Sequence, residues 1–212
     1  MLNRKDLLLY LCTDRALTLG RPLMEAVEAA IEGGVTMIQL REKDVSSRTF
    51  YDMALEVQAV TKRHHIPLVI NDRLDIALAV GAEGLHIGQS DLPLRAARKL
   101  AGDRLFIGVS ARTTAEALVA QEEGADYLGV GAVFPTGSKA DAGDAIGLEQ
   151  LGNIRSAVHI PVIGIGGIGP RNVEAVMKTG IAGIAVISAI LSQRDIRAAA
   201  EQLRRSLGSP ES

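Results

Sequence analysis

Four segments of the chain repeat one local pattern, in which a glycine closes a helical stretch and a short apolar run follows it. The segments are Glu32–Ile38, Val80–Ile87, Glu123–Val130 and Thr179–Val186. A glycine in this position typically ends a helix, and the apolar run after it has the composition of a buried strand. Each repeat therefore predicts a helix that leads directly into a strand.

Four further apolar runs lie between these segments, and stretches with helical spacing separate them. The runs are Leu7–Thr13, Pro67–Ile70, Leu105–Val109 and Pro161–Ile165, rich in Val, Ile and Leu as strands buried on both faces are. Eight strand and helix units about 25 residues apart favour a (β/α)8 barrel over an open doubly wound sheet, which more often has fewer strands. The last helix is predicted over Ile196–Leu207. We expect residues 1–212 to form one (β/α)8 TIM-barrel domain.

Composition and charge exclude several classes of partner. Lys and Arg total 23 against 25 Asp and Glu, a formal charge of −2, and no basic run offers a surface for nucleic acid. No stretch approaches the ~18 uncharged apolar residues of a membrane span, and no secretory signal is readable, so we expect a cytoplasmic protein. The single cysteine, Cys12, lies in an apolar run and is expected to be a buried small hydrophobe. Small-molecule substrates are the expected partners, and the sequence leaves open a homo-oligomer.

Functional groups of such barrels collect where the strands end, on the loops that lead into the helices. After the second strand, alternation places Gln39 and Arg41 on one face, with Lys43 further along the loop. Two cations and an amide would then face the barrel mouth. The alternative is a solvated loop in which Arg41 pairs with Glu42.

Two carboxylates follow the third and fourth strands. Asp72 comes directly after Asn71, and Asp91 follows the strand that contains His86. Neighbouring strands lie ~4.8 Å apart, so the two carboxylates can converge on Mg²⁺ together with substrate phosphates. An aspartate after a strand is also typical of a helix N-cap, which remains the alternative for each. We expect His86 to be a core or supporting residue rather than a base.

The remaining strand ends offer hydroxyls, a lysine and glycines. Ser110 ends the fifth strand, and a long connection over Phe134–Gly147 predicts a phosphoryl-binding lid, with a surface excursion as the alternative. The glycine-rich segment Gly164–Pro170 follows the seventh strand, and Ser188 follows the eighth. Because these two loops form the recurrent phosphate site of such barrels, the sequence predicts a bound monophosphate there.

Taken together, these motifs resemble those of the thiamine phosphate synthase family over nearly the whole chain. The matching motifs are Tyr10–Asp14, Gln39–Lys43, Asn71–Arg73, His86–Asp91, Gly108–Ser110, Pro135–Lys139 and Gly164–Ile168. One departure is visible, because the family loop often reads Pro-Thr-x-Thr-Lys and Ser138 replaces the second threonine. The hydroxyl is retained, so the departure bears on phosphate affinity more than on activity.

The resemblance implies a Mg²⁺-dependent transferase of thiamine biosynthesis. It would join 4-amino-5-hydroxymethyl-2-methylpyrimidine pyrophosphate to 4-methyl-5-(2-hydroxyethyl)thiazole phosphate, giving thiamine phosphate and pyrophosphate. The family mechanism is dissociative: pyrophosphate leaves first, and the thiazole nitrogen captures a pyrimidine-methyl cation. That nitrogen carries no proton, so neither a nucleophile nor an obligatory general base is needed.

The resemblance also assigns roles to individual residues. Gln39 is placed on the pyrimidine, and Ser110 near the leaving group or the pyrimidine. Asp72 and Asp91 are placed on Mg²⁺. The pyrophosphate would be held by Arg41, Lys43, Asn71 and Lys139, and the thiazole phosphate by Thr136, Ser138, Gly167, Ile187 and Ser188.

Two other functions remain open on the sequence. One is a thiazole tautomerase-like isomerase on the same scaffold, which does not handle pyrophosphate. The combined presence of Arg41, Lys43, Asp72, Asp91 and Lys139 argues against it. The other is a non-catalytic phosphate-binding barrel. Dependence on Mg²⁺ distinguishes the synthase from the isomerase, and turnover distinguishes it from the non-catalytic barrel.

Overall fold

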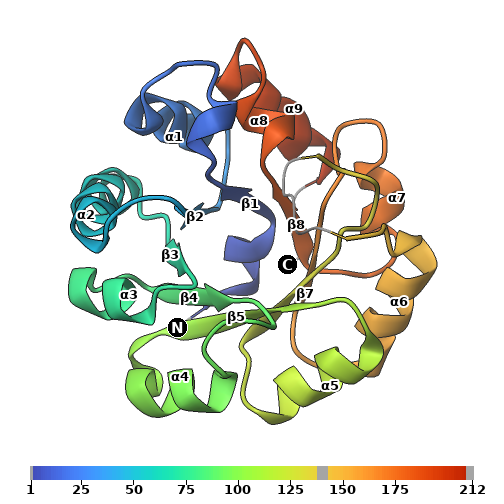
Figure 1. The fold of residues 1–212 in the computed structure, drawn as a ribbon. Helices are drawn as coiled ribbons and strands as arrows, with labels where there is room; N and C mark the ends of the chain where they lie inside the picture. Colours follow the sequence, from blue (N-terminus) through green and yellow to red (C-terminus); the bar gives the residue numbers. More distant parts are fainter. Residues whose placement is uncertain (1, 138–142, 209–212) are drawn as a thin grey trace.

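Eight parallel strands close into a barrel in a computed structural model of the chain, which describes residues 2–137 and 143–208. The strands follow one another around the barrel in chain order, and β1 closes it by pairing with β8 (Figure 1). Their bounds are β1 Leu9–Cys12, β2 Met37–Leu40, β3 Leu68–Asn71, β4 Gly84–Ile87, β5 Phe106–Ala111, β6 Tyr127–Val130, β7 Val162–Ile165 and β8 Gly183–Val186. The predicted (β/α)8 architecture is confirmed.

Helices surround the strands in the same order (Figure 1). The α-helices are α1 Leu23–Glu32, α2 Ser47–Arg63, α3 Leu74–Val80, α4 Leu94–Ala101, α5 Thr114–Glu122, α6 Gly147–Ala157, α7 Val173–Met177, α8 Ser188–Leu191 and α9 Ile196–Ser206. The 3-10 helices of the described residues are η1 Arg4–Leu7 before β1, η2 Arg15–Leu17 after β1 and η3 Gly102–Arg104 before β5. None of the helices in the described ranges is long and apolar enough to span a membrane.

The start of the first strand and the helices after the last strand differ from the sequence-based expectation. Leu7 ends η1 instead of starting the first strand, because Asn3 and Asp6 form a capping box that begins a helical turn at Arg4. After β8 the chain forms the short helix α8 before α9, whereas the sequence pattern predicts a single final helix.

Side chains fill the interior of the barrel, so it is a packed core below an open mouth. Tyr10 and Tyr127 lie inside it and are fully buried, and Cys12 is buried as expected. Glycines make room for the large rings. A Cβ on Gly108 would overlap the ring of Tyr127, and a Cβ on Gly84 would overlap the ring of Phe106.

Candidate active site

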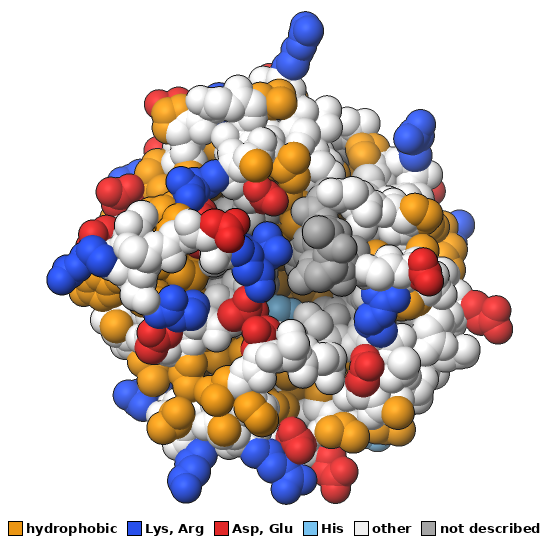
Figure 2. All heavy atoms as spheres, in the orientation of Figure 1, with side chains coloured by type: hydrophobic (Ala, Val, Ile, Leu, Met, Phe, Trp, Pro, Cys, Tyr) orange, Lys and Arg blue, Asp and Glu red, His pale blue; other side chains and the backbone are white. Residues whose placement is uncertain are grey.

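A cavity of about 1450 Å³ opens at the carboxyl ends of the strands. Figure 2 looks onto this face and shows acidic and basic side chains gathered beside a central hollow, with a histidine at its base. Most of the expected site residues line the cavity: Arg41, Lys43, Asn71, Asp72, Asp91, Ser110, Thr136, Gly167, Ile187 and Ser188. Gln39 lies deeper, in a recess of about 20 Å³ that shares His86 and Ser110 with the cavity. Ser138 and Lys139 lie outside the described residues.

Asp72 and Asp91 form an acidic pair on one side of the cavity. Burial raises the pKa of the Asp72 carboxyl, the neighbouring Asp91 carboxyl raises it further, and Lys43 opposes both. Lys43 Nζ lies 2.6 Å from Asp72 Oδ2. No group of three or more His, Cys, Asp or Glu side chains suited to a metal occurs in the described part of the chain. Two carboxylates with room for water and phosphate oxygens fit Mg²⁺, which keeps several such ligands.

Neither aspartate caps a helix, so the N-cap alternative is wrong for both. The N-cap positions of α3 and α4 are Arg73 and Pro93, and neither helix has a side-chain cap. Asp91 Oδ2 instead accepts a hydrogen bond from the Gly88 N–H at 2.7 Å, which shapes the loop after β4. Asp72 has a positive φ of 61°, and its N–H donates to the His86 carbonyl oxygen at 2.8 Å. Non-glycine residues in this conformation are uncommon and cluster at functional sites.

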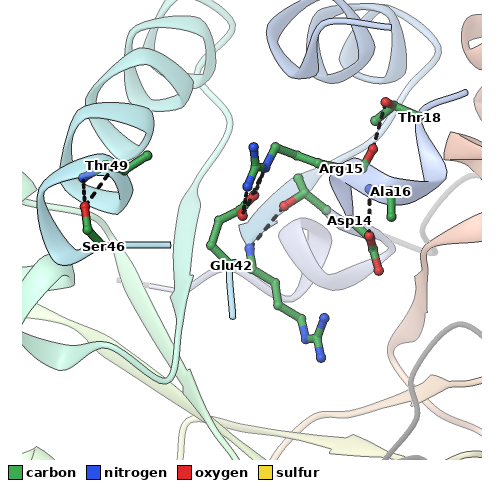
Figure 3. A network of polar contacts seen from close by, with 9 residues as sticks. Asp14, Arg15, Ala16, Thr18, Glu42, Ser46 and Thr49 are labelled. Carbon is green, nitrogen blue, oxygen red and sulfur yellow. Dashed lines mark hydrogen bonds and ion pairs between the residues drawn. The ribbon is translucent and has the colours of Figure 1, made fainter. Parts of the chain in front are cut away.

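Arg41 does not pair with Glu42. Glu42 accepts hydrogen bonds from Arg15 Nε at 2.9 Å and 3.0 Å, and Arg15 Nη2 lies 2.9 Å from Glu42 Oε2 (Figure 3). The Arg41 N–H is held by Thr13 Oγ1 at 3.1 Å, while its guanidinium makes no hydrogen bond or ion pair to the residues described. The cation of Arg41 is therefore available to an anionic ligand. The role of Arg15 was not predicted, because no local sequence pattern connects the loop after β1 with the loop after β2.

Asn71 provides a second free group beside the acidic pair. The residue is only 6% exposed, yet its side-chain amide makes no hydrogen bond within the described ranges. No fully buried side-chain nitrogen or oxygen lacks a partner in the part of the chain described, so this amide must reach the cavity that Asn71 lines. Buried amides are normally hydrogen-bonded, which indicates a ligand contact.

The opposite side of the cavity is built from a glycine turn and the start of a helix. Gly167 has a φ of 67°, and a Cβ there would come within 2.7 Å of Phe134 Cβ. Asn172 holds the turn by accepting from the Gly169 N–H and donating to the Gly167 carbonyl oxygen, both at 2.9 Å. Ile187 is the N-cap residue of α8 and Ser188 is its first residue. Such backbone, with its N–H groups near the surface, suits an anion.

A chain of hydrogen bonds runs beneath the cavity and crosses the inside of the barrel. Gln39 Nε2 donates to Tyr10 Oη at 2.8 Å, and the Tyr10 and Tyr127 hydroxyl oxygens lie 3.0 Å apart. His86 then joins Tyr127 Oη through Nδ1 and Ser110 Oγ through Nε2, both at 3.0 Å. His86 is thus buried in the barrel, as expected for a core residue, and its supporting role stays a prediction. The two tyrosines were not expected in the site, although their strand positions were visible in the sequence.

Known proteins resemble this chain over most of its length. The sequence pattern of the family described as thiamine monophosphate synthase (TMP-TENI) matches residues 9–190. The chain belongs to the thiamine-phosphate synthase family. It is 54% identical over 198 residues to the thiamine-phosphate synthase of Clostridium tetani, covering 93% of this chain and 94% of that protein. It is 53% identical over 203 residues to that of Ruminiclostridium cellulolyticum, covering 96% of both.

Solved structures extend the comparison to three dimensions. A thiamine phosphate pyrophosphorylase from Pyrococcus furiosus superposes with a TM-score of 0.90 at 44% identity, covering 96% of both chains. A 3-hexulose-6-phosphate synthase shares the barrel with a TM-score of 0.68 at 21% identity, covering 94% of this chain and 99% of that one. The second likeness concerns the fold alone. Membership of the thiamine-phosphate synthase family therefore rests on the sequence matches and on the first structure.

Proposed function

We propose that this chain forms thiamine phosphate by joining the pyrimidine diphosphate to the thiazole phosphate, with release of diphosphate. The observation that carries the proposal is one cavity with groups suited to anions on two of its sides. Arg41, Asn71 and the acidic pair lie on one side, and the Gly167 turn and the start of α8 lie on the other. A reaction between two phosphorylated heterocycles needs such an arrangement, because both must be held with their reacting atoms close together.

The side after β2, β3 and β4 is proposed to hold the diphosphate. The guanidinium of Arg41 and the amide of Asn71, which have no partner among the described residues, would bind its oxygens, and Lys43 can follow once it leaves Asp72. Their charges and donors stabilise the negative charge that accumulates on the departing diphosphate. Lys139 is assigned to the same group from the family pattern alone, and its loss is expected to lower kcat about 100-fold to 1000-fold.

Asp72 and Asp91 are proposed to hold Mg²⁺. The ion, when bound, neutralises charge on the diphosphate oxygens and so assists its departure. The chain contributes two carboxylates that repel each other when both are charged, a repulsion that a divalent cation relieves. Lys43 occupies part of this position next to Asp72, so we expect it to move toward the diphosphate when the cation binds.

The other side is proposed to hold the thiazole phosphate. Thr136, Gly167, Ile187 and Ser188 line the cavity there, and Ser138 joins them on the family pattern. Gln39 and Ser110, at the base of the cavity, are proposed to bind the pyrimidine. No nucleophile or general base is required, because the thiazole nitrogen attacks without losing a proton. The chain's contribution is positioning and charge stabilisation.

Turnover with defined substrates tests the proposal. Purified protein is mixed with Mg²⁺, the pyrimidine diphosphate and the thiazole phosphate, and thiamine phosphate is sought by mass spectrometry. We expect product with Mg²⁺ and loss of product when the metal is chelated. Absence of product from folded protein contradicts the proposal. The cytoplasmic location and a homo-oligomeric state stay predictions, which cell fractionation and light scattering can test.

A further inference from the structure

The buried chain from Gln39 to Ser110 contains enough contacts to fix the direction of every proton in it. Tyr10 and Tyr127 are both fully buried. Burial raises the pKa of each phenol above its ordinary value, so each hydroxyl is neutral and has one proton to donate. The direction of the chain then depends on which atom accepts each proton.

The side-chain amide nitrogen of Gln39, Nε2, can only donate a hydrogen bond. Among the described residues, the Tyr10 hydroxyl has two hydrogen-bond partners, Gln39 Nε2 and Tyr127 Oη. Because Nε2 cannot accept, the Tyr10 proton must be donated to Tyr127. The Tyr127 proton is then left for His86 Nδ1. With Gln39 Nε2 facing Tyr10, any other arrangement leaves a buried hydroxyl proton without an acceptor, which is costly.

The imidazole of His86 connects Tyr127 to Ser110 at the cavity. His86 Nδ1 accepts and therefore carries no proton, so the neutral ring carries its proton on Nε2. Nε2 lies 3.0 Å from Ser110 Oγ and donates to it. Ser110 accepts in that bond, which leaves its own proton free to point into the cavity that it lines.

We propose that Tyr10, Tyr127 and His86 are positioning residues that set the hydrogen-bonding character of the pyrimidine site. They hold His86 as the Nε2–H tautomer and make Ser110 a donor toward the ligand. At the other end, Gln39 Oε1 makes no hydrogen bond to the described residues and opens to the small recess, where it is a free acceptor.

One free acceptor and one free donor match the edge of a 4-aminopyrimidine. Its amino group donates, and the adjacent ring nitrogen accepts. A 4-oxopyrimidine presents the opposite pattern, with an acceptor oxygen next to a ring N–H, so the site selects against it. This step rests on the proposed function, because it takes the pyrimidine as the ligand at the base of the cavity.

Close packing keeps the chain in one arrangement. The ring centroids of Tyr10 and Tyr127 are 6.1 Å apart, and those of His86 and Tyr127 are 5.6 Å apart. A Cβ on Gly129 would lie 3.0 Å from His86 Cε1, so the imidazole lies directly against the backbone of β6. The rings cannot turn to other partners without displacing neighbours.

The tautomer of His86 is measured directly by nitrogen NMR on wild-type protein labelled at histidine. Its signal is assigned by its loss in His86→Asn. We expect a protonated Nε2 and an unprotonated Nδ1. A proton on Nδ1 overturns the proposal, whether or not the protein turns over substrate, because the chain would then run in the opposite direction.

A hydroxyl deletion tests the consequence for the ligand. In Tyr127→Phe we expect the His86 signals to change to a mixture of tautomers and the KM for the pyrimidine diphosphate to rise roughly 3-fold to 10-fold. The KM for the thiazole phosphate should stay near the wild-type value. Tyr51→Phe is the matched control, because Tyr51 lies on α2 and its hydroxyl has no hydrogen bond to the residues described.

These outcomes separate the inference from the proposed function. Wild-type protein without turnover but with the Nε2–H tautomer would refute the synthase proposal and leave the direction of the chain intact. A Tyr127→Phe variant that keeps a single Nε2–H tautomer and the wild-type KM for the pyrimidine diphosphate would overturn the positioning role. An equal rise in both KM values would also overturn it, because that result indicates a general structural defect.

Discussion

At the scale of single residues, Asp72 combines two unusual properties. Its backbone has a positive φ, and burial and Asp91 raise the pKa of its carboxyl. Such a residue is retained in a structure when the surroundings hold it in place, and here its N–H is bonded to His86 and its carboxylate to Lys43. Without a ligand, Lys43 provides the positive charge that the acidic pair requires.

Asp72→Asn and Asp91→Asn should each abolish most of the Mg²⁺-dependent turnover. A neutral amide is a weaker ligand for a hard cation than a carboxylate. Asparagine tolerates a positive φ, so Asp72→Asn should keep the fold, which circular dichroism checks. Asp75→Asn is the control, because Asp75 is an exposed carboxylate on α3 whose ion-pair partner is Arg73. Unchanged turnover at limiting Mg²⁺ in either site variant would remove that residue from the proposed metal site.

Arg15→Ala should weaken binding of the diphosphate substrate although Arg15 is not assigned to the ligand. The Glu42 side chain is 6% exposed, and without Arg15 its charge becomes available to Arg41 or Lys43. Because Arg15 is half exposed, water screens the pair, and we expect only about 1 kcal/mol lower stability. Steady-state KM values and urea unfolding measure the two effects.

The double variant Arg15→Ala with Glu42→Gln provides the control for that interpretation. Removing both charges should restore part of the affinity for the diphosphate, since no carboxylate then competes for Arg41. If the double variant binds the substrate as weakly as Arg15→Ala, competition by Glu42 is not the cause.

At the scale of secondary-structure elements, the glycines of the strands decide which rings enter the barrel. Gly108 on β5 lies against Tyr127 on β6, and Gly129 on β6 lies against His86 on β4. In the sequence, these glycines look like ordinary members of apolar runs. Their function is to leave space across the barrel, so that polar groups from β1, β2, β4, β5 and β6 meet in one hydrogen-bonded chain.

Gly108→Ala should therefore destabilise the protein by about 1 to 3 kcal/mol, because the added methyl overlaps the Tyr127 ring. Gly152→Ala is the matched control. Gly152 lies within α6, where a Cβ meets nothing within 4 Å, and alanine in a helix should add about 1 kcal/mol of stability. Urea unfolding measures both. A Gly108→Ala variant as stable as the wild type would contradict the placement of Tyr127.

At the scale of the whole molecule, the closed barrel brings together groups that are far apart in the chain. The two sides of the cavity come from strands near the start and strands near the end, and closure between β1 and β8 places both around one opening. Ligands that bind either side should stabilise the entire fold, because the cavity exists only when the barrel is closed.

Inorganic diphosphate with Mg²⁺ should raise the Tm of the wild-type protein. At a diphosphate concentration ~100 times Kd, binding adds about 2.7 kcal/mol to the free energy of unfolding. Asp72→Asn should lose most of this increment. Inorganic phosphate, bound at the Gly167 turn, should raise the Tm of both proteins equally. Thermal unfolding with and without each ion tests this, and equal stabilisation by diphosphate in the absence of Mg²⁺ would contradict the proposed division of the cavity.

The barrel, its eight strands and the strand ends at which the site residues lie could all be predicted from the sequence. These features follow from local periodicity and glycine caps, which depend on neighbours along the chain. The sequence also allowed the family to be recognised and Asp72, Asp91 and Arg41 to be placed at the mouth. Only the tertiary structure decided that Arg15 takes Glu42 away from Arg41, that Lys43 pairs with Asp72, and that Tyr10 and Tyr127 connect Gln39 to His86. Each of these contacts joins different strands or their loops, and its partner is set by how the strands close into a barrel, which no local pattern contains.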